Sequence, residues 1–389
     1  MGSFYRAVAI LVLNTLLLVA GFELAARGVF TLAHVLATPL EPRVGEGDPR
    51  ETVSYYASQA WATQYWYEFR LSHTQRYYPY VGWRRAPFKG QTIEIDQSGV
   101  RVTPGADCRP QSLKVFTFGA SAMWGTGAPN WGTIPAYVQQ GLEKRRPGPV
   151  CVRNFAESAY VVMQDIIMLL LQLRAGHVPD VVLFYNMDGD TYAAYQSGRA
   201  GVPENLAQLA ARFEGRRELA TVVEQLRQTS AYALVDRLMG RLTIATPPPQ
   251  GPPRKLLTYE SMGIDAAQLS AGIVQTYLAN YTIVRALAQT YGFQYFLFLP
   301  PSITLGNKPL TSEEHAMKAK AESDAALVKL STAVYHNLER ASAHYPHLFS
   351  LVHIFDQYEG LLWIDEGHVT PIGNHMIAER MLDIIQAFN

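Results

Sequence analysis

Val115-Phe116-Thr117-Phe118-Gly119-Ala120-Ser121 is the stretch of sequence that decides the fold. Its first part consists of β-branched and aromatic residues, which favour a buried strand. Gly119 and Ala120 are small and predict a tight turn directly after that strand. The turn carries Ser121 at its tip. The stretch therefore predicts a strand that leads into a candidate nucleophile.

A matching base and carboxylate occur near the end of the chain, in Asp365-Glu366-Gly367-His368. A serine hydroxyl needs a base within hydrogen-bond reach, and the base needs a carboxylate that holds its tautomer. Thr370 is an expected N-cap and Pro371 a first-turn residue, so a helix should follow this loop and fix it. We predict that Ser121, His368 and Asp365 form a catalytic triad.

Strand and helix patterns alternate from residue 113 onward. Strands are expected at 113–118, 150–154, 181–185, 295–299 and 347–355, and helices at 134–145, 162–174, 271–291, 312–342 and 371–388. Such alternation predicts an α/β fold with a parallel sheet between helices. Ligands bind at the carboxyl ends of such strands. Ser121 and the Asp365 loop both fall there.

The first 40 residues read as a membrane anchor. Apolar residues run from Ala7 to Phe22 with few interruptions, and a helix continuing to Leu36 is long enough to cross a bilayer. Val19-Ala20-Gly21 also fits a signal-peptide cleavage site, and a peripheral or core helix is a third interpretation. We expect an uncleaved transmembrane helix.

Three parts follow from this pattern: the anchor and its extension at 1–40, a linker and extension at 41–107, and an α/β domain at 108–389. Residues 61–83 are rich in aromatic side chains, which either pack against the main domain or form a contact belt for a membrane or partner. Helical periodicity and the run Pro247-Pro248-Pro249-Gln250-Gly251-Pro252-Pro253 predict a helical cap insertion at about 203–256.

Composition excludes several classes of function. The chain has 33 basic and 33 acidic residues, so it lacks the excess of positive charge that is typical of nucleic-acid-binding proteins. No cluster of Cys or His has metal-ligand spacing, and we expect neither metal nor cofactor. The chain has 2 cysteines, Cys108 and Cys151. They either form a disulfide, which would place the domain outside the cytoplasm, or are two buried thiols.

The nucleophile segment also excludes two common folds. Gly119-Ala120-Ser121-Ala122-Met123 lacks the second glycine of the G-x-S-x-G elbow, so an ordinary α/β-hydrolase is not expected. No lysine follows Gly125 and Gly127, which excludes a phosphate-binding P-loop.

From about Tyr77 to its end the chain resembles the SGNH/GDSL hydrolase superfamily, in particular its bacterial membrane-anchored branch. The resemblance rests on four blocks, namely 118–127, 154–160, 182–190 and 365–368. It implies a flavodoxin-like sheet and hydrolysis of carboxylic esters, often acetyl groups on carbohydrate. It also implies an oxyanion hole made by the Ser121 amide, a second-block amide and a third-block asparagine.

The sequence departs from that pattern at the oxyanion hole. Ala156 and Ala159 stand where glycines are usual, and an alanine resists positive φ. The alignment of Asp190 with the motif's aspartate places Gly189 at the asparagine position, where it offers no side-chain donor. We therefore assign the oxyanion hole to Ser121, Ala159 and Gly189 and expect it to be degenerate.

Two functions are carried forward. The first is a weakly active or non-catalytic accessory subunit of a bacterial inner-membrane assembly, with its main domain in the periplasm and with other membrane subunits and lipid as partners. The second is an active ester hydrolase, O-deacetylase or acyltransferase acting on cell-envelope glycan or lipid. A missing oxyanion donor costs about 100- to 1,000-fold in turnover, which favours the first.

Overall fold

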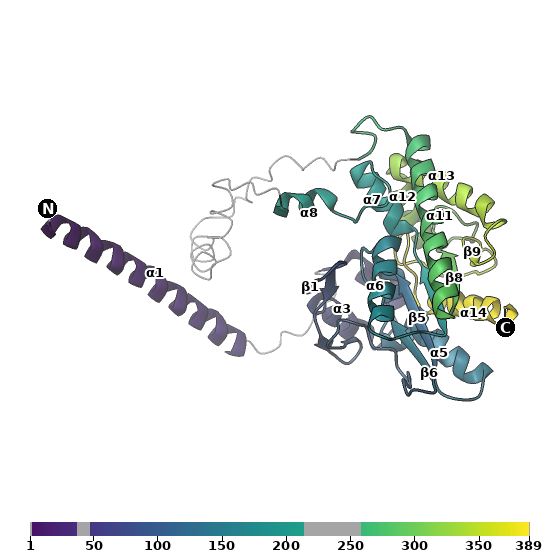
Figure 1. Cartoon of the computed structure of the whole chain (residues 1–389), viewed down its shortest axis with the longest axis horizontal. Helices are drawn as coiled ribbons and strands as arrows, with labels where there is room; N and C mark the ends of the chain where they lie inside the picture. Colours follow the sequence, from purple (N-terminus) through teal and green to yellow (C-terminus); the bar gives the residue numbers. More distant parts are fainter. Residues whose placement is uncertain (1, 37–46, 214–257, 389) are drawn as a thin grey trace. The chain divides into compact units, whose positions relative to one another are not determined.

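The computed structural model describes residues 2–36, 47–213 and 258–388 (Figure 1). The chain divides into two units, Met1–Glu41 with Gln208–Lys255, and Pro42–Ala207 with Leu256–Asn389. Most of the predicted cap, including its proline run, lies outside the described residues.

A five-stranded parallel sheet forms the centre of the larger unit, in the order β6-β5-β7-β8-β9. Its strands are β5 Leu113–Gly119, β6 Val150–Asn154, β7 Val181–Tyr185, β8 Gln294–Leu299 and β9 Leu348–Ser350. The register pairs Val115 with both Val152 and Val181. The predicted α/β class and its parallel sheet are confirmed.

Helices cover both faces of the sheet (Figure 1). On one face, α5 Ile134–Arg145 and α14 Pro371–Ala387 pack over Val115, Val152 and Leu183. On the other, α6 Val162–Arg174, α11 Ala266–Tyr291 and α13 Ala325–Ser342 pack over Phe116 and Phe184. Successive residues of a strand point to opposite faces, so both faces of these strands are buried and apolar.

Two predicted elements differ from the structure. The single helix expected at 312–342 is two helices, α12 Ser312–Glu322 and α13, because the Asp324 side chain accepts a hydrogen bond from Leu327 N at 3.0 Å and starts a new helix. The strand expected at 347–355 ends at Ser350, where Leu351 N makes a last bond to Leu299 O at 3.0 Å and a turn follows.

The segment before the sheet consists of short elements. They are η1 Pro49–Thr52, α2 Ser54–Ala57, α3 Ala62–Leu71, the hairpin β1 Gln75–Tyr78 with β2 Gly82–Arg85, and the pair β3 Phe88–Lys89 with β4 Glu94–Ile95. On α3, Tyr65, Trp66 and Phe69 are buried in the core cluster beside α5 and α14. Tyr77 and Tyr80 of the hairpin are exposed. The aromatic segment thus packs against the main domain through α3.

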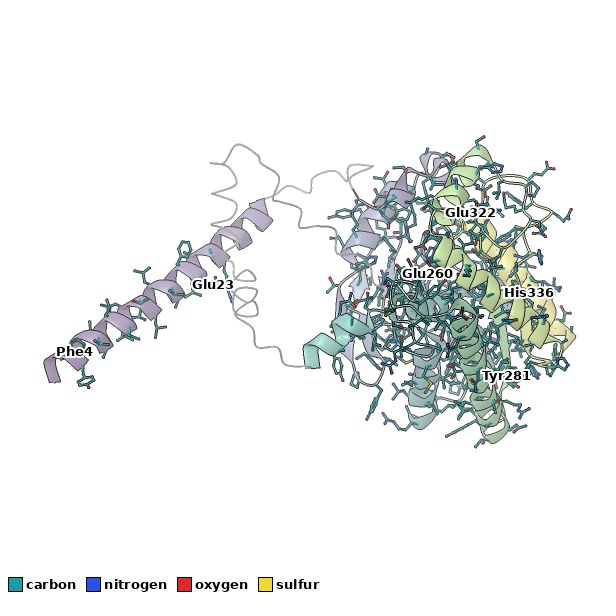
Figure 2. All side chains as sticks on the ribbon, turned by 90° about the horizontal axis from the view of Figure 1, so that it is seen from above. Phe4, Glu23, Glu260, Tyr281, Glu322 and His336 are labelled. Carbon is teal, nitrogen blue, oxygen red and sulfur yellow. A yellow bond between two sulfur atoms is a disulfide. The ribbon has the colours of Figure 1, made fainter. Side chains whose placement is uncertain are left out.

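The remaining described helices are α4 Ser121–Trp124, η2 Asn130–Gly132, α7 Asp188–Ser197, α8 Leu206–Phe213 and α1 Gly2–Leu36. In α1, the stretch Phe4–Gly28 is long and apolar enough to cross a membrane, and a signal sequence passes the same test. Figure 2 shows its side chains between Phe4 and Glu23. It is the one such helix among the described residues.

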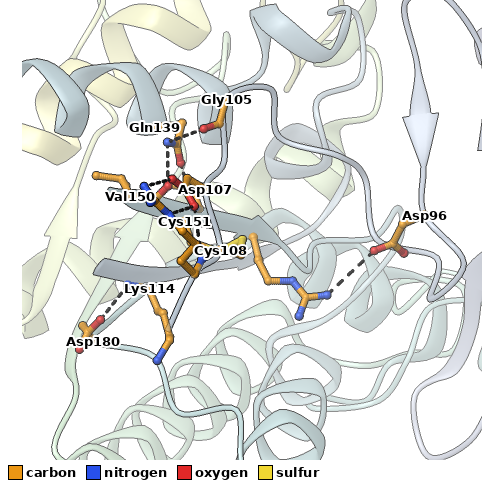
Figure 3. The surroundings of a disulfide bond; sticks show 12 residues. Asp96, Gly105, Asp107, Cys108, Lys114, Gln139, Val150, Cys151 and Asp180 are labelled. Atoms are coloured by element: carbon orange, nitrogen blue, oxygen red, sulfur yellow. Dashed lines mark hydrogen bonds and ion pairs between the residues drawn. A yellow bond between two sulfur atoms is a disulfide. The ribbon is translucent and has the colours of Figure 1, made fainter. Parts of the chain in front are cut away.

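Cys108 and Cys151 form a disulfide that ties the chain before β5 to strand β6 (Figure 3). Gln139 of α5 braces the same region, because its amide donates to Val150 O at 3.0 Å and accepts from Val152 N at 2.9 Å. Of the two interpretations of the cysteines, the disulfide is the one in the structure.

Candidate functional site

Ser121 begins α4 just after the carboxyl end of β5, the strand between β6 and β7. Gly119 makes this sharp turn possible: its φ is 157°, and a Cβ there would lie 2.3 Å from Tyr185 O and 2.8 Å from the Met123 Cβ. Only glycine fits so close an approach of two backbones. The small-residue turn predicted from the sequence therefore has a steric cause.

The structure brings Ser121, His368 and Asp365 into one hydrogen-bonded chain. Ser121 Oγ lies 2.7 Å from His368 Nε2, and His368 Nδ1 lies 2.7 Å from Asp365 Oδ2. The side chains of His368 and Asp365 are 17% and 20% exposed, so the base is enclosed and yet reachable from solvent. This is the order of contacts in which a histidine takes a proton from a serine and a carboxylate holds the histidine.

Asp365 is fixed by more than the histidine. Its Oδ1 accepts the backbone N–H of Gly367 at 3.0 Å and that of His368 at 2.7 Å, while Arg50 Nη1 lies 3.2 Å from its Oδ2. Burial acts to raise the pKa of Asp365, but the charges of His368 and Arg50 and these hydrogen bonds outweigh it and lower the pKa. Asp365 is therefore ionised at neutral pH.

The loop that carries Asp365 and His368 is closed on itself and anchored to α12. Ile364 N donates to His368 O at 3.0 Å, and Thr370 N donates to Leu362 O at 2.7 Å. The buried Glu314 carboxylate accepts Leu362 N at 2.9 Å and Trp363 N at 3.1 Å. Thr370 stands at the predicted N-cap of α14, but its hydroxyl makes no capping hydrogen bond. Backbone contacts and Glu314, not that cap, hold the loop.

Two residues that the sequence assigns to the oxyanion hole, Ser121 and Ala159, have backbone amides that are unpaired within the described part of the chain. Ala159 has a φ of 65°, so the expectation that an alanine there avoids positive φ is wrong. A left-handed residue other than glycine costs about 1 to 2 kcal/mol, and such strain gathers at functional sites.

Gly189 has no room for a side chain. A Cβ on Gly189 would lie 2.3 Å from Tyr160 O, so this position faces the second block. The side chain of Asn186 is buried and already paired, since its Nδ2 donates to Tyr160 O at 3.0 Å and to Asp165 Oδ2 at 2.9 Å. Neither residue therefore offers a free side-chain donor for an oxyanion.

Asp188, at the start of α7, is the third-block side chain that reaches the triad loop. Tyr335 Oη donates to its Oδ1 at 2.6 Å, and its Oδ2 lies 3.7 Å from where a Cβ on Gly367 would stand. Burial raises the pKa of Asp188 to about 6. At pH 7 Asp188 is therefore mostly a carboxylate. It lies beside the triad loop, in the block where the resemblance implies a neutral asparagine donor.

Sequence reasoning missed two contributions to the site. Arg50 is 315 residues from Asp365 in the chain and belongs to no block of the resemblance, so no local signal pointed to it. Tyr335 lies on the face of α13 that reads simply as core. Among the described residues, no group of three or more His, Cys, Asp or Glu side chains could hold a metal ion.

Fold and site together define an α/β protein with a Ser-His-Asp arrangement, of the kind found in serine hydrolases, at the carboxyl ends of its strands. No known protein family matches the sequence, and no curated protein matches it either. Several solved structures do resemble the chain. The lipase Lip_vut3 from a goat rumen metagenome is 14% identical over 70% of this chain and 97% of the lipase, with a TM-score of 0.37.

Two further structures show the same extent of similarity. TesA is 11% identical over 71% of this chain and 99% of its own, with a TM-score of 0.36. A member of the lipolytic G-D-S-L family from Veillonella parvula is 11% identical over 70% and 97%, with a TM-score of 0.35. At these identities and TM-scores the similarity concerns the fold and carries no argument about activity.

Proposed function

We propose that this protein is a serine hydrolase that cleaves carboxylic esters through an acyl-enzyme on Ser121. One observation carries the proposal, namely the hydrogen-bonded chain from Ser121 Oγ through His368 to Asp365. The free amides of Ser121 and Ala159 support it, because they supply two donors for the oxyanion. The accessory-subunit expectation rested on a depleted oxyanion hole, and the positive φ of Ala159 removes part of that reason.

The geometry gives each residue a role in a balanced reaction. Ser121 Oγ bonds to the acyl carbon while its proton passes to His368 Nε2, and the carbonyl electron pair moves onto the oxygen. The oxyanion collapses and expels the alcohol, which takes the proton from His368. Water then repeats the sequence and releases the carboxylic acid. An alcohol acceptor in place of water would make the same site an acyltransferase.

The substrate class that we propose is an ester of cell-envelope glycan or lipid. The support is the apolar helix α1, which fits a membrane anchor, together with the Cys108–Cys151 disulfide, which fits an oxidising compartment such as a bacterial periplasm. Both fit an ester hydrolase that acts near a membrane surface outside the cytoplasm.

Covalent labelling tests the proposal. A fluorophosphonate probe is expected to label the full-length protein in detergent, and Ser121→Ala is expected to abolish labelling and to lower p-nitrophenyl acetate hydrolysis by at least about 1,000-fold. Ser58→Ala, which changes an exposed serine of the N-terminal segment, is the matched control and should leave both readouts unchanged. Labelling that survives in Ser121→Ala would exclude Ser121 as the nucleophile.

The accessory subunit remains a second candidate because of Asp188, whose carboxylate opposes an oxyanion. It predicts that extraction in mild detergent yields a stable complex and that Ser121→Ala leaves this complex intact. Recovery of the protein alone, with Ser121-dependent labelling, would favour the hydrolase.

A further inference from the structure

The short segment before the α/β fold reaches into the triad through Arg50. Its Nη1 lies 3.2 Å from Asp365 Oδ2, the oxygen that also contacts His368 Nδ1 at 2.7 Å. Arg50 and His368 thus share one carboxylate oxygen of the triad. No other cationic side chain in the described residues forms an ion pair with Asp365.

The guanidinium of Arg50 is held in place before any substrate binds. Asp48 accepts its Nε at 2.7 Å, and Asp48 Oδ2 lies 2.5 Å from its Nη2. The aromatic rings of Trp66 and Phe69 lie 5.9 Å and 5.6 Å from its central carbon, within cation–π range. A planar guanidinium with this many fixed partners loses little entropy when it meets Asp365.

The segment that carries Arg50 is itself rigid. Asp48 and Glu51 form a capping box around η1, and Pro49 fills the first helical position. Glu51 also pairs with Arg70 of α3, whose neighbour Phe69 is buried in the core. The contact with Asp365 is therefore part of a packed structure and not a loose surface ion pair.

We propose that Arg50 is a positioning residue of the triad: it fixes the Asp365 carboxylate and shares that carboxylate's charge with His368. This inference rests on the proposed function. The reasoning is electrostatic. A carboxylate stabilises an added proton on a neighbouring imidazole through its negative charge. That stabilisation is weaker when a cation shares the same carboxylate.

Other charged or titratable groups face Arg50 or the Asp365–His368 pair, and Arg50→Met leaves all of them in the sequence. Those that face the pair are Asp48 before η1, Tyr56 of α2 and Asp188 of α7, which is itself next to Glu366 of the triad loop. Those that face Arg50 are Tyr65 of α3, Arg85 of β2 and His73. A shift that follows Arg50 substitution therefore reports Arg50 itself.

The test uses full-length protein in detergent and two readouts. Arg50→Met is expected to move the acid limb of the kcat/KM profile upward by about one pH unit and to lower turnover at pH 6 about tenfold. Arg50→Lys keeps the charge and should keep the limb near its wild-type position. Arg145→Met is the control. It removes an arginine of α5 that pairs with Glu379 and Asp383 of α14, and it should change neither the acid limb nor the turnover.

Titration of the His368 ring by NMR, assigned with His368→Gln, gives the second readout and needs no turnover. Its midpoint should rise in Arg50→Met. An unchanged midpoint in a folded Arg50→Met protein overturns the inference, whereas a shifted midpoint without Ser121-dependent hydrolysis overturns the proposed function alone. If Arg50→Met fails to fold, Arg50→Gln replaces it: this variant keeps a polar side chain without the charge and should move the midpoint the same way.

Discussion

At the scale of single residues, Asp188 places a titratable carboxyl group beside the triad loop. Its Oδ1 is fixed by Tyr335 Oη at 2.6 Å, and its Oδ2 faces the loop between Asp365 and His368. Burial raises its pKa to about 6, so the group is mostly a carboxylate at pH 8 and mostly neutral at pH 5. Negative charge beside a developing oxyanion opposes the reaction only in the first case.

Asp188→Asn is therefore expected to be a gain-of-function substitution at alkaline pH. The amide keeps an oxygen for Tyr335 and removes the charge, so kcat/KM for p-nitrophenyl acetate should rise about tenfold at pH 8 and change little at pH 5. The measurement is a pH profile of both proteins.

Asp190→Asn is the matched control, because Asp190 lies in the same turn of α7 but accepts Val162 N at 2.8 Å, away from the triad. Its profile should follow the wild type. Equal activity of Asp188→Asn and wild type across the pH range would show that Asp188 does not face the oxyanion.

At the scale of elements, the strands and most helices could be predicted because their cause is local. The strand 181–185 is uniformly apolar and the strand 150–154 begins with Val-Cys-Val, and both form at the predicted bounds. The break between α12 and α13 could not be predicted, since Asp324 reads equally well as a solvated helical residue. Arg50 reaches the site through long-range packing, which short motifs do not report.

Glu314 of α12 determines where the triad loop lies. Its buried carboxylate accepts Leu362 N and Trp363 N, and it contacts Lys308 Nζ at 2.7 Å. Glu314→Gln leaves the buried Lys308 without a counter-charge, so we expect a loss of about 3 kcal/mol in the free energy of unfolding, measured by urea at pH 7. Glu322→Gln, on the exposed face of the same helix, should cost less than about 0.5 kcal/mol.

The Glu314 contribution should also depend on pH with a defined sign. Burial acts to raise the pKa of Glu314, but Lys308 and the backbone donors outweigh this and lower the pKa below its ordinary value of 4.5. The stabilisation is then complete above the unfolded pKa and is lost as pH falls through the folded value. Wild type should lose stability below about pH 4, and Glu314→Gln should lose less. An equal acid loss in both proteins would contradict this account of the loop.

At the scale of the whole molecule, the disulfide and α1 point to the same compartment. The Cys108–Cys151 bond closes a loop that contains Ser121 and joins residues separated by 43 positions. Such bonds persist in oxidising compartments and are rare in the cytosol. A chain made in the cytosol reaches such a compartment by a membrane anchor or by a cleaved signal, and α1 fits both.

A membrane anchor at α1 predicts that a protein that retains α1 stays in the membrane. After sodium carbonate extraction, a C-terminally tagged protein should remain in the pellet with an intact mass that includes α1, because burial of Phe4–Gly28 in hydrocarbon outweighs the effect of high pH. Leu16→Arg places a charge at mid-span, at a cost of about 3 kcal/mol, and should shift protein to the supernatant. Ser121→Ala, which leaves α1 untouched, should fractionate like the wild type. A soluble product whose mass begins after Val19-Ala20-Gly21 would identify α1 as a signal sequence, and the hydrolase would then act free of the membrane.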